Sequence, residues 1–337
     1  MRNLKTKILA LYLILASAIP CIAQNAEQND SLVNVIAFFS MNDTTEYRET
    51  HLEYKVQDND TIFQHGYSEK FQLIVRDSTA TDYTIECISN DFDYLSDDPD
   101  FADKLAKMTW DITKKTPLII KVDSLGALVS IVNWKEYRNA VQPAFKVACE
   151  MLKREIDENV INIPSLILMF NSKTNSEDVI AQNNSVTKMF SNHGLMYKLG
   201  EKKVQTEFSG YPTEINGETY IIAKDSKDED PEIAYAGDYG IKSVSVTKAP
   251  AAELSKKGLD LIKQTLTTQS ISEIDKHKSD INEEVKKIGD VNIINEEHYA
   301  YFFNGWPKYI GSQKTVDIGI SKNIKIEEIE WTRMHWK

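Results

Sequence analysis

Apolar and polar residues alternate along several stretches in the first part of the chain. Every second residue is apolar over 52–56, 71–75 and 83–87. A period of two is typical of strands that bury one face. A tighter hairpin is predicted over 118–132, around the turn Asp123-Ser124-Leu125-Gly126. We therefore expect an antiparallel meander over about 31–132.

The apolar period changes to three and four after residue 133. This spacing predicts a helix over 134–152, in which Pro143 implies a kink or a late start. Further helices are expected over 161–170, where Pro164 interrupts the pattern, and over 175–191. Another helical region spans 251–289. Its second half is highly charged, so we expect it on the surface.

Strands return over about 195–248 and again from residue 299 to the C-terminal end. Asn216-Gly217 stands between short alternating stretches and predicts a tight hairpin turn, and Asn304-Gly305 predicts another turn. These turn residues divide the later part of the chain into short antiparallel strands.

The last strand contains a change of phase. Ile324 and Ile326 alternate together, whereas Ile329 and Trp331 have moved by one position. A β-bulge at Glu327-Glu328 would return all four side chains to one buried face, and we predict such a bulge.

Runs of strands and runs of helices are segregated along the chain, which favours an α+β fold over a doubly wound one. We expect a large antiparallel sheet, in one form an open, curved half-barrel, with the helical segments packed on its apolar face. No linker rich in Pro, Gly or Ser divides the chain. Residues 31–337 are therefore expected to form one large domain, or alternatively two intimate strand–helix halves, about 31–192 and 195–337.

The first residues have the three parts of a secretory signal peptide. Three basic residues and no acid are followed by an uncharged run over 8–19, which is too short to span a membrane, and then by Pro20-Cys21-Ile22-Ala23. We predict a signal peptide over 1–23, cleaved after Ala23, and a polar, flexible leader over 24–30. The mature chain would be periplasmic or extracellular.

Cys21 supports a rival interpretation, in which the chain is a bacterial lipoprotein anchored by lipid on that cysteine. Lipoprotein signals carry a small residue directly before the cysteine, whereas Pro20 stands there in this chain. We therefore prefer soluble export and keep the lipid anchor as the alternative.

Charge narrows the set of partners. The formal charge is −12, and removal of residues 1–23, which hold three basic residues and no acid, would make it −15. Such a surface repels phosphate backbones, so nucleic acid is a poor partner. The mature chain has no apolar run long enough for a transmembrane segment.

The two cysteines that remain after cleavage, Cys87 and Cys149, both lie on apolar faces of predicted elements. They form one disulfide or stay as two buried thiols. Neither has a neighbouring histidine in the sequence, which argues against a catalytic thiolate.

Motifs for chemistry are few. The chain lacks glycine-rich nucleotide loops, a Gly-x-Ser-x-Gly elbow and zinc-ligand spacings, so we predict no cofactor and no catalytic residue. Acidic residues crowd one loop, but their spacing is not that of a calcium loop, and we expect it to be solvated. The weak calcium candidates are Asp91, Asp93, Asp97, Asp98 and Asp100.

Aromatic residues gather near the end of the chain. Tyr299, Tyr301 and Trp306 are weak candidates for stacking on a sugar or an apolar ligand. Alternating aromatic residues in a strand are more often sheet core, and Trp306, just after the predicted turn, is the one we expect to be exposed.

Three functions remain. The first is a non-enzymatic binding or carrier protein for an apolar or lipid-like ligand, in which helices cover an apolar sheet face. In architecture alone this is similar to the bacterial periplasmic lipoprotein carriers, and no residue is transferred from them. The second is a cell-envelope interaction module that binds another envelope protein. The third is a secreted hydrolase using paired carboxylates, for which a carboxyl group of raised pKa in a cleft would be the evidence.

Overall fold

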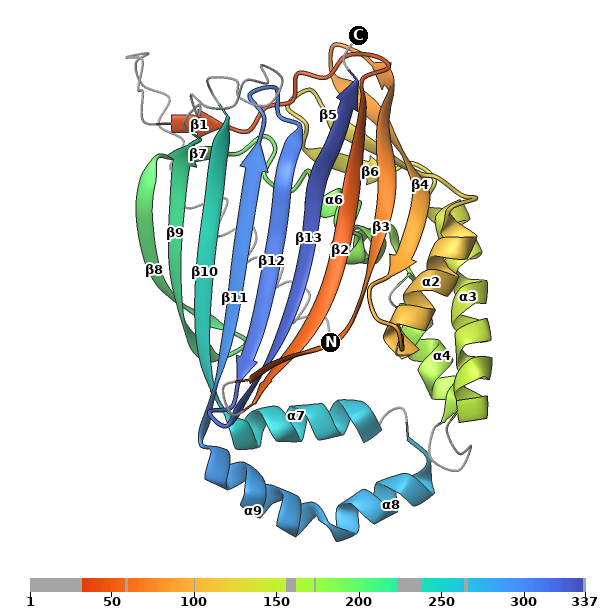
Figure 1. The fold of residues 1–337 in the computed structure, drawn as a ribbon, viewed down its shortest axis with the longest axis vertical. Coiled ribbons are helices and arrows are strands. Elements are labelled where there is room, and N and C mark those ends of the chain that lie inside the picture. Colours follow the sequence, from red (N-terminus) through yellow and green to blue (C-terminus); the bar gives the residue numbers. More distant parts are fainter. Residues whose placement is uncertain are drawn as a thin grey trace.

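A computed structural model describes residues 32–57, 60–99, 101–155, 162–172, 174–222, 238–263 and 266–335. Within them, eleven strands form an antiparallel sheet in the order β6-β5-β4-β3-β2-β13-β12-β11-β10-β9-β8 (Figure 1), and β1 pairs with β7 separately. The predicted α+β fold with a large, curved antiparallel sheet is confirmed. The predicted signal peptide and leader, residues 1–30, lie outside the described residues.

The strands are β1 (Leu32–Asn34), β2 (Thr44–Gln57), β3 (Asp60–Ser78), β4 (Asp82–Tyr94), β5 (Leu118–Asp123), β6 (Leu128–Ile131), β7 (Met196–Lys198), β8 (Gly200–Phe208), β9 (Tyr211–Ile221), β10 (Tyr239–Pro250), β11 (Asp290–Tyr301), β12 (Pro307–Asp317) and β13 (Ser321–His335). The helices are α2 (Phe101–Thr113), α3 (Trp134–Glu155), α4 (Ile163–Ser172), α5 (Glu177–Asn183), α6 (Ser185–Lys188), α7 (Ala251–Lys263), α8 (Thr268–Lys276) and α9 (Lys278–Ile288).

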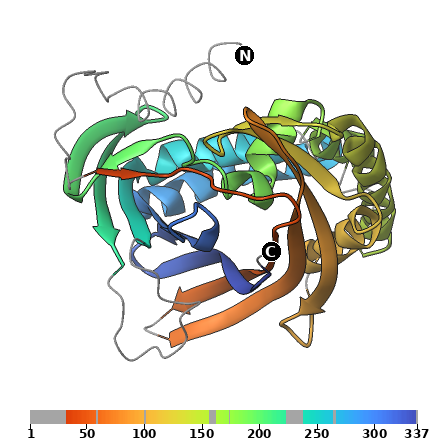
Figure 2. The same ribbon diagram turned by 90° about the horizontal axis from the view of Figure 1, so that it is seen from above.

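The sheet is continuous across both parts of the chain, because β2 pairs with β13 at its centre. Seen from above, it curves into an open ring with α6 on the concave side (Figure 2). Buried residues of α5, α6 and the turn after them, such as Ile180, Val186 and Phe190, belong to the same core as Phe71 and Ile85 of the sheet. The upper part of the concave face is therefore the apolar core of the molecule.

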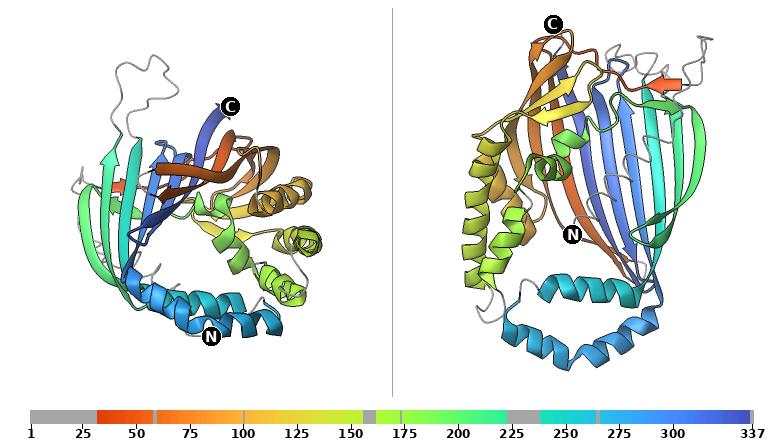
Figure 3. Two further views of the ribbon diagram at one scale, coloured as in Figure 1. Left: turned by 60° about the horizontal axis from the view of Figure 1, so that its bottom comes forward. Right: turned by 180° about the vertical axis from the view of Figure 1, so that it is seen from behind.

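The helices α7, α8 and α9 lie across the lower end of the sheet in Figure 1, which Figure 3 shows from below and from behind. No residue of α8 is buried, which agrees with the surface position predicted for this charged region. Among the residues that the structure describes, no helix has the length and apolar content needed to cross a membrane.

The predicted hairpin turn at Asn216-Gly217 is wrong. The strand β9 runs through both residues, which pair with Val244 and Ser243 of β10 and with β8 on the other side. The chain turns instead at Ser209-Gly210, where φ is 55° and 87°. Two antiparallel neighbours supply backbone partners along the whole strand, and they override the local preference of Asn-Gly for a turn.

The predicted bulge at Glu327-Glu328 is also wrong. The pairing of β13 with β12 and β2 is regular through these residues, and the irregularity lies later, between Trp331 and Arg333. Because the register is unbroken, Ile324 and Ile326 face the convex side, whereas Ile329 faces the concave core. The change of phase therefore reflects a switch of the apolar residues from the convex to the concave face of the sheet. The strand itself stays regular at these residues.

Three further differences concern helices. The segment Phe101–Thr113 is the helix α2, although we expected only strands before residue 133. The predicted helix 175–191 is divided into α5 and α6 at Asn184, whose side chain caps α6 by accepting a hydrogen bond from Val186 N. Pro143 lies inside a continuous α3, so the helix does not start late.

Candidate functional site

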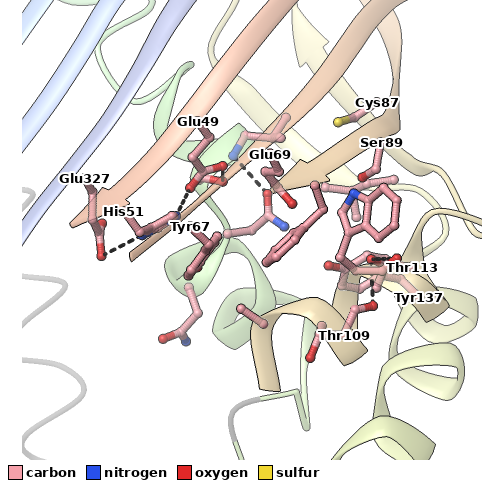
Figure 4. Close-up of a pocket in the computed structure, with 18 of the residues that line it drawn as sticks. Glu49, His51, Tyr67, Glu69, Cys87, Ser89, Thr109, Thr113, Tyr137 and Glu327 are labelled. Carbon is pink, nitrogen blue, oxygen red and sulfur yellow. Dashed lines mark hydrogen bonds and ion pairs between the residues drawn. The ribbon is translucent and has the colours of Figure 1, made fainter. Parts of the chain in front are cut away.

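A cavity of about 280 Å³ lies on the concave side of the sheet, directly below the apolar core. Its lining comes from β2, β3, β4, β13, α2, α3 and α6 (Figure 4), and we call it the concave cavity. The sequence predicted an apolar cavity, but many of the lining groups are carboxyl, imidazole, hydroxyl and amide groups. Antiparallel pairing sets them side by side, because Glu49 is opposite Glu69, and His51 is opposite Tyr67.

Glu49 is the central acid of the site, and its side chain is well supplied with hydrogen-bond donors. Nε2 of His51 lies 2.7 Å from Oε1 of Glu49, and the hydroxyl of Ser185 donates to Oε2 at 2.7 Å. Only 4% of Glu49 is exposed. The carboxylate is thus held by groups from its own strand and from α6, and solvent has little access to it.

Glu69 is the second acid, and it shares a hydrogen bond with Glu49. Burial raises the pKa of Glu69 well above its usual range, and the nearby charge and hydrogen bond of Glu49 raise it further. Two adjacent carboxyl groups in a poorly solvated place cannot both ionise cheaply. Glu49 and Glu69 therefore act as a carboxyl pair that holds one proton, with Glu69 as the protonated partner.

A third acid, Glu327, has a different environment. Nζ of Lys188 lies 3.3 Å from one of its carboxyl oxygens, and Nζ of Lys325 lies 3.1 Å from the other. Nδ1 of His51 lies 3.8 Å away. Burial alone would raise the pKa of Glu327, but Lys188, His51 and Lys325 together lower it to about 2. Glu327 is therefore ionised and neutralised by its own cations. Figure 4 shows it beside His51.

Aromatic rings form another part of the lining. Tyr67 stacks on His51 with ring centroids 4.5 Å apart and on Phe92 at 5.1 Å, and Phe92 is 5.8 Å from Trp110. Tyr137 of α3 also lines the cavity. The indole nitrogen of Trp110 is buried and has no hydrogen-bond partner among the described residues. A buried donor without a partner costs free energy.

A smaller cavity of about 150 Å³ shares His51 and Tyr67 with the concave cavity. Its own histidine, His65, lies between two acids. Nδ1 is 3.2 Å from Asp103, and Nε2 is 3.3 Å from Glu53. This arrangement ties strand β3 to the first turn of α2 and extends the chain of acids and histidines along the concave face.

The cavity contains a carboxyl group of raised pKa, Glu69, which is the feature that the hydrolase alternative requires. Each oxygen of Glu49 already accepts a hydrogen bond, so this carboxylate is poorly placed to activate a water molecule. Across the parts of the chain that the structure describes, no three His, Cys, Asp or Glu side chains converge in a way that could hold a metal ion.

The aromatic residues chosen from the sequence lie away from this cavity. Tyr301 and Trp306 are fully buried, and Tyr299 packs beside them in the core. The expectation that Trp306 is exposed is wrong. Its ring lies 4.2 Å from that of Phe39, and Phe38 N donates to Asn304 O, so the segment before β2 covers the turn.

Cys87 and Cys149 are free, buried thiols, the second of the two alternatives. Cys87 lines the concave cavity, and burial, followed by the nearby acidic side chains, raises the pKa of its thiol, which keeps it neutral. In the acidic loop, Asp91 pairs with Lys70 at 3.1 Å. Asp93 lies near the end of strand β4, and Asp97 and Asp98 lie in the bend after it. Asp100 lies outside the described residues.

Sequence reasoning missed the residues that form the site. The available signal was the phase of two strands: Glu49 and His51 share a face with Tyr47, and Tyr67 and Glu69 share one with Phe71. Along both strands, ionisable residues take the alternating positions that apolar core residues hold further along. Such a change marks the place where the core gives way to a cleft.

No known protein family has a sequence profile that matches this chain, and no curated protein matches it in sequence. Among solved structures, a lipovitellin structure described as showing lipid–protein interactions is 8% identical, with a TM-score of 0.36. The match covers 88% of this chain but only 26% of the lipovitellin chain.

Two outer-membrane proteins are also similar at a lower level. An outer membrane channel from Pseudomonas putida F1 is 5% identical with a TM-score of 0.17, covering 91% of this chain and all of that one. Salmonella typhi OmpF, in complex with daunomycin, is 6% identical with a TM-score of 0.19, covering 86% and 98%. All three TM-scores are below 0.5, and we draw nothing about function from them.

Proposed function

We propose that the protein is a non-enzymatic binding protein for a small amphipathic ligand, which it holds in the concave cavity. The observation that supports this function most directly is the mixed lining of the cavity. It joins the Glu49–Glu69 carboxyl pair and His51 to the rings of Tyr67, Phe92 and Trp110.

The dimensions and the polar groups fit a small ligand. A volume of about 280 Å³ is close to the lower end of small-molecule pockets, which are concave and use a few placed polar groups to orient the ligand. The carboxyl pair is such a group. A ligand with one polar end and a short apolar part would place its polar end at the pair and stack on the rings.

The proposal is tested by calorimetric titration of the full mature chain with three probes of equal chain length: octylamine, octanol and octanoate. We expect at least one probe to bind with one-to-one stoichiometry. Thr109 of α2 lines the cavity, so Thr109→Phe would fill it and abolish binding. The matched control is Thr50→Phe, on the convex face of β2, which should bind as the wild type does. Absence of binding for all three probes, or equal binding by the two variants, would contradict the proposal.

We also propose that the protein acts after export, on the basis of the charge and apolar pattern of residues 1–23. Intact-mass analysis of the chain expressed in a Gram-negative host, with cells fractionated, is the test. A periplasmic form beginning at Gln24 supports the proposal. A form that begins at Cys21 with added lipid mass supports the anchored alternative, and a cytosolic form that retains Met1 or Arg2 contradicts both.

A further inference from the structure

We propose that the polar end of the ligand is an ammonium group, which pairs with Glu69 and takes the place of the proton held between Glu49 and Glu69. This inference rests on the proposed binding function and names the class of ligand that the concave cavity selects.

Among the described residues, the ion-pair partner of the carboxyl pair is an imidazole, that of His51 on Glu49. No lysine or arginine in the part of the chain that the structure describes forms an ion pair with Glu49 or Glu69, whereas Glu327 in the same cavity pairs with two lysines. Glu49 is satisfied by His51 and Ser185, and Glu69 is the member that remains partly accessible in the lining. The cavity therefore presents a carboxyl group whose charged form needs a cation from outside.

The aromatic lining favours the same class of ligand. The face of an aromatic ring attracts a cation, and the effect is strongest for tryptophan. Trp110 already attracts two cations, because Nζ of Lys107 and Lys114 lie 4.4 Å and 4.2 Å from its ring centroid. Neither lysine lines the cavity, and both pair with Asp111 on the outer side of α2. Tyr67 and Phe92 also line the cavity, although Tyr67 already stacks on His51 and on Phe92.

Most other titratable groups around Glu69 do not take part in the replacement of the shared proton by the ammonium group. Burial and nearby carboxylates raise the pKa of Tyr67, Cys87 and Tyr137, which stay neutral across the ordinary pH range. Glu327 stays ionised beside Lys188. His51 remains as the group that faces the pair from β2 and could also release a proton.

The exchange balances in atoms and charge. Before binding, Glu69 is a neutral carboxylic acid that donates its proton to Glu49. On binding, that proton leaves to solvent, Glu69 becomes a carboxylate, and the N–H groups of the ammonium donate to it. No covalent bond of the ligand changes. The total charge of the cavity with its contents stays the same, which avoids the cost of two adjacent, unpaired carboxylates.

The experiment compares the same three probes and counts protons. We expect octylamine to bind at least about tenfold more tightly than octanol, and octanoate to bind least, at about pH 5.5. Titration in two buffers of different ionisation enthalpy should show a proton released when octylamine binds, because Glu69 is still protonated at a pH where an ordinary glutamate is ionised.

Two variants identify the group that releases the proton. Glu69→Gln keeps the shape and the donor of the protonated acid but cannot ionise, so it should bind octylamine no better than octanol and release no proton. Glu330→Gln is the matched control, on the convex face of β13, and should behave as the wild type does. Proton release that persists in Glu69→Gln would assign it to another group, such as His51, and overturn the inference.

The outcomes separate this inference from the proposed function. If octanol or octanoate binds as tightly as octylamine and Thr109→Phe abolishes that binding, the cavity binds a ligand but does not select a cation. If none of the probes binds, the binding function itself fails.

Discussion

The concave face of the sheet has two parts, and the same strands build both. In the upper part, Tyr47 of β2 lies opposite Phe71 of β3, and both are almost completely buried. One step of the pleat further down, Glu49 lies opposite Glu69. The register of β2 with β3 is unchanged between the two rows, whereas the pairing of β3 with β4 shifts between Lys70 and Phe71. On β2 and β3 a change of residue type turns a packed core into a lined cavity, which shows how neighbouring strands can carry a site without a loop.

The two parts also differ in what covers them. Residues of α5, α6 and the turn that follows seal the upper rows with apolar side chains, including Met189 and Phe190. Over the lower row, Ser185 and Lys188 of α6 present polar groups instead. Burial of Glu49 is tolerated because two donors satisfy it, and that of Glu69 because it keeps its proton.

The largest expected effect tests the upper part. Phe71→Ala removes a ring that is 1% exposed and stacks on Tyr47 at 5.5 Å, and should lower the free energy of unfolding by about 3–5 kcal/mol. The matched control is Phe63→Ala on the same strand, whose ring is also 5.5 Å from a tyrosine, Tyr54, but is 38% exposed. It should cost under about 1 kcal/mol. Urea unfolding measures both. Equal losses would mean that the concave rows are not the core.

The contrast between the two parts explains how far the sequence predicted the fold. Alternation and segregation of elements sufficed for the sheet and its α+β class, because strand period depends only on which side chains are apolar. Local signals failed where distant strands decided the outcome. Asn216-Gly217 is a turn signal, yet two neighbouring strands hold it extended. The phase change at Ile326 and Ile329 suggested a bulge because we assumed one buried face, whereas the sheet carries apolar residues on both.

The site was harder to predict than the fold. Glu49 and Glu69 are twenty residues apart, and nothing local shows that the register sets them side by side. Alternation does place Glu49 in phase with Tyr47, but exposed strands show the same mixture of residues. Trp306 was misjudged for the same reason, because the segment that covers it, around Phe39, precedes it by most of the chain.

The prediction of intermediate size concerns the lower row, and it is the pH dependence of stability that Glu69 causes. The pKa of Glu69 is raised in the folded state, so its contribution to stability is fully present below the ordinary glutamate pKa and is lost as the pH rises through the raised value. The contribution of Glu69 to the free energy of unfolding of the wild type should therefore fall as the pH rises above about 4.5. Glu69→Gln should lack this part of the fall and be the more stable protein at the upper end of the range.

Urea unfolding of both proteins at a series of pH values measures this difference. Glu330→Gln again serves as the matched control, and its pH dependence should follow that of the wild type. A Glu69→Gln variant whose stability parallels the wild type at every pH would show that Glu69 ionises as an ordinary surface acid, and the distinction between the two rows would then be one of packing alone.

The smallest expected effect tests whether the ion pair between Lys188 and Glu327 stabilises the lower row. Lys188→Gln removes one cation from Glu327, whose low pKa stabilises the fold above about pH 4.5 and is lost as the pH falls towards 2. Since Lys188 is 47% exposed, solvent screens the pair, and the loss of stability should be under about 1 kcal/mol. The pKa of Glu327, followed by carboxyl NMR, should nevertheless rise, although Lys325 and His51 remain. The control is Lys322→Gln, which breaks the ion pair between Lys322 and Asp317 and should leave the pKa of Glu327 unchanged. If Lys188→Gln also leaves it unchanged, then α6 covers the cavity without setting its charge, and the contrast with Glu69 rests on burial rather than on the distribution of cations.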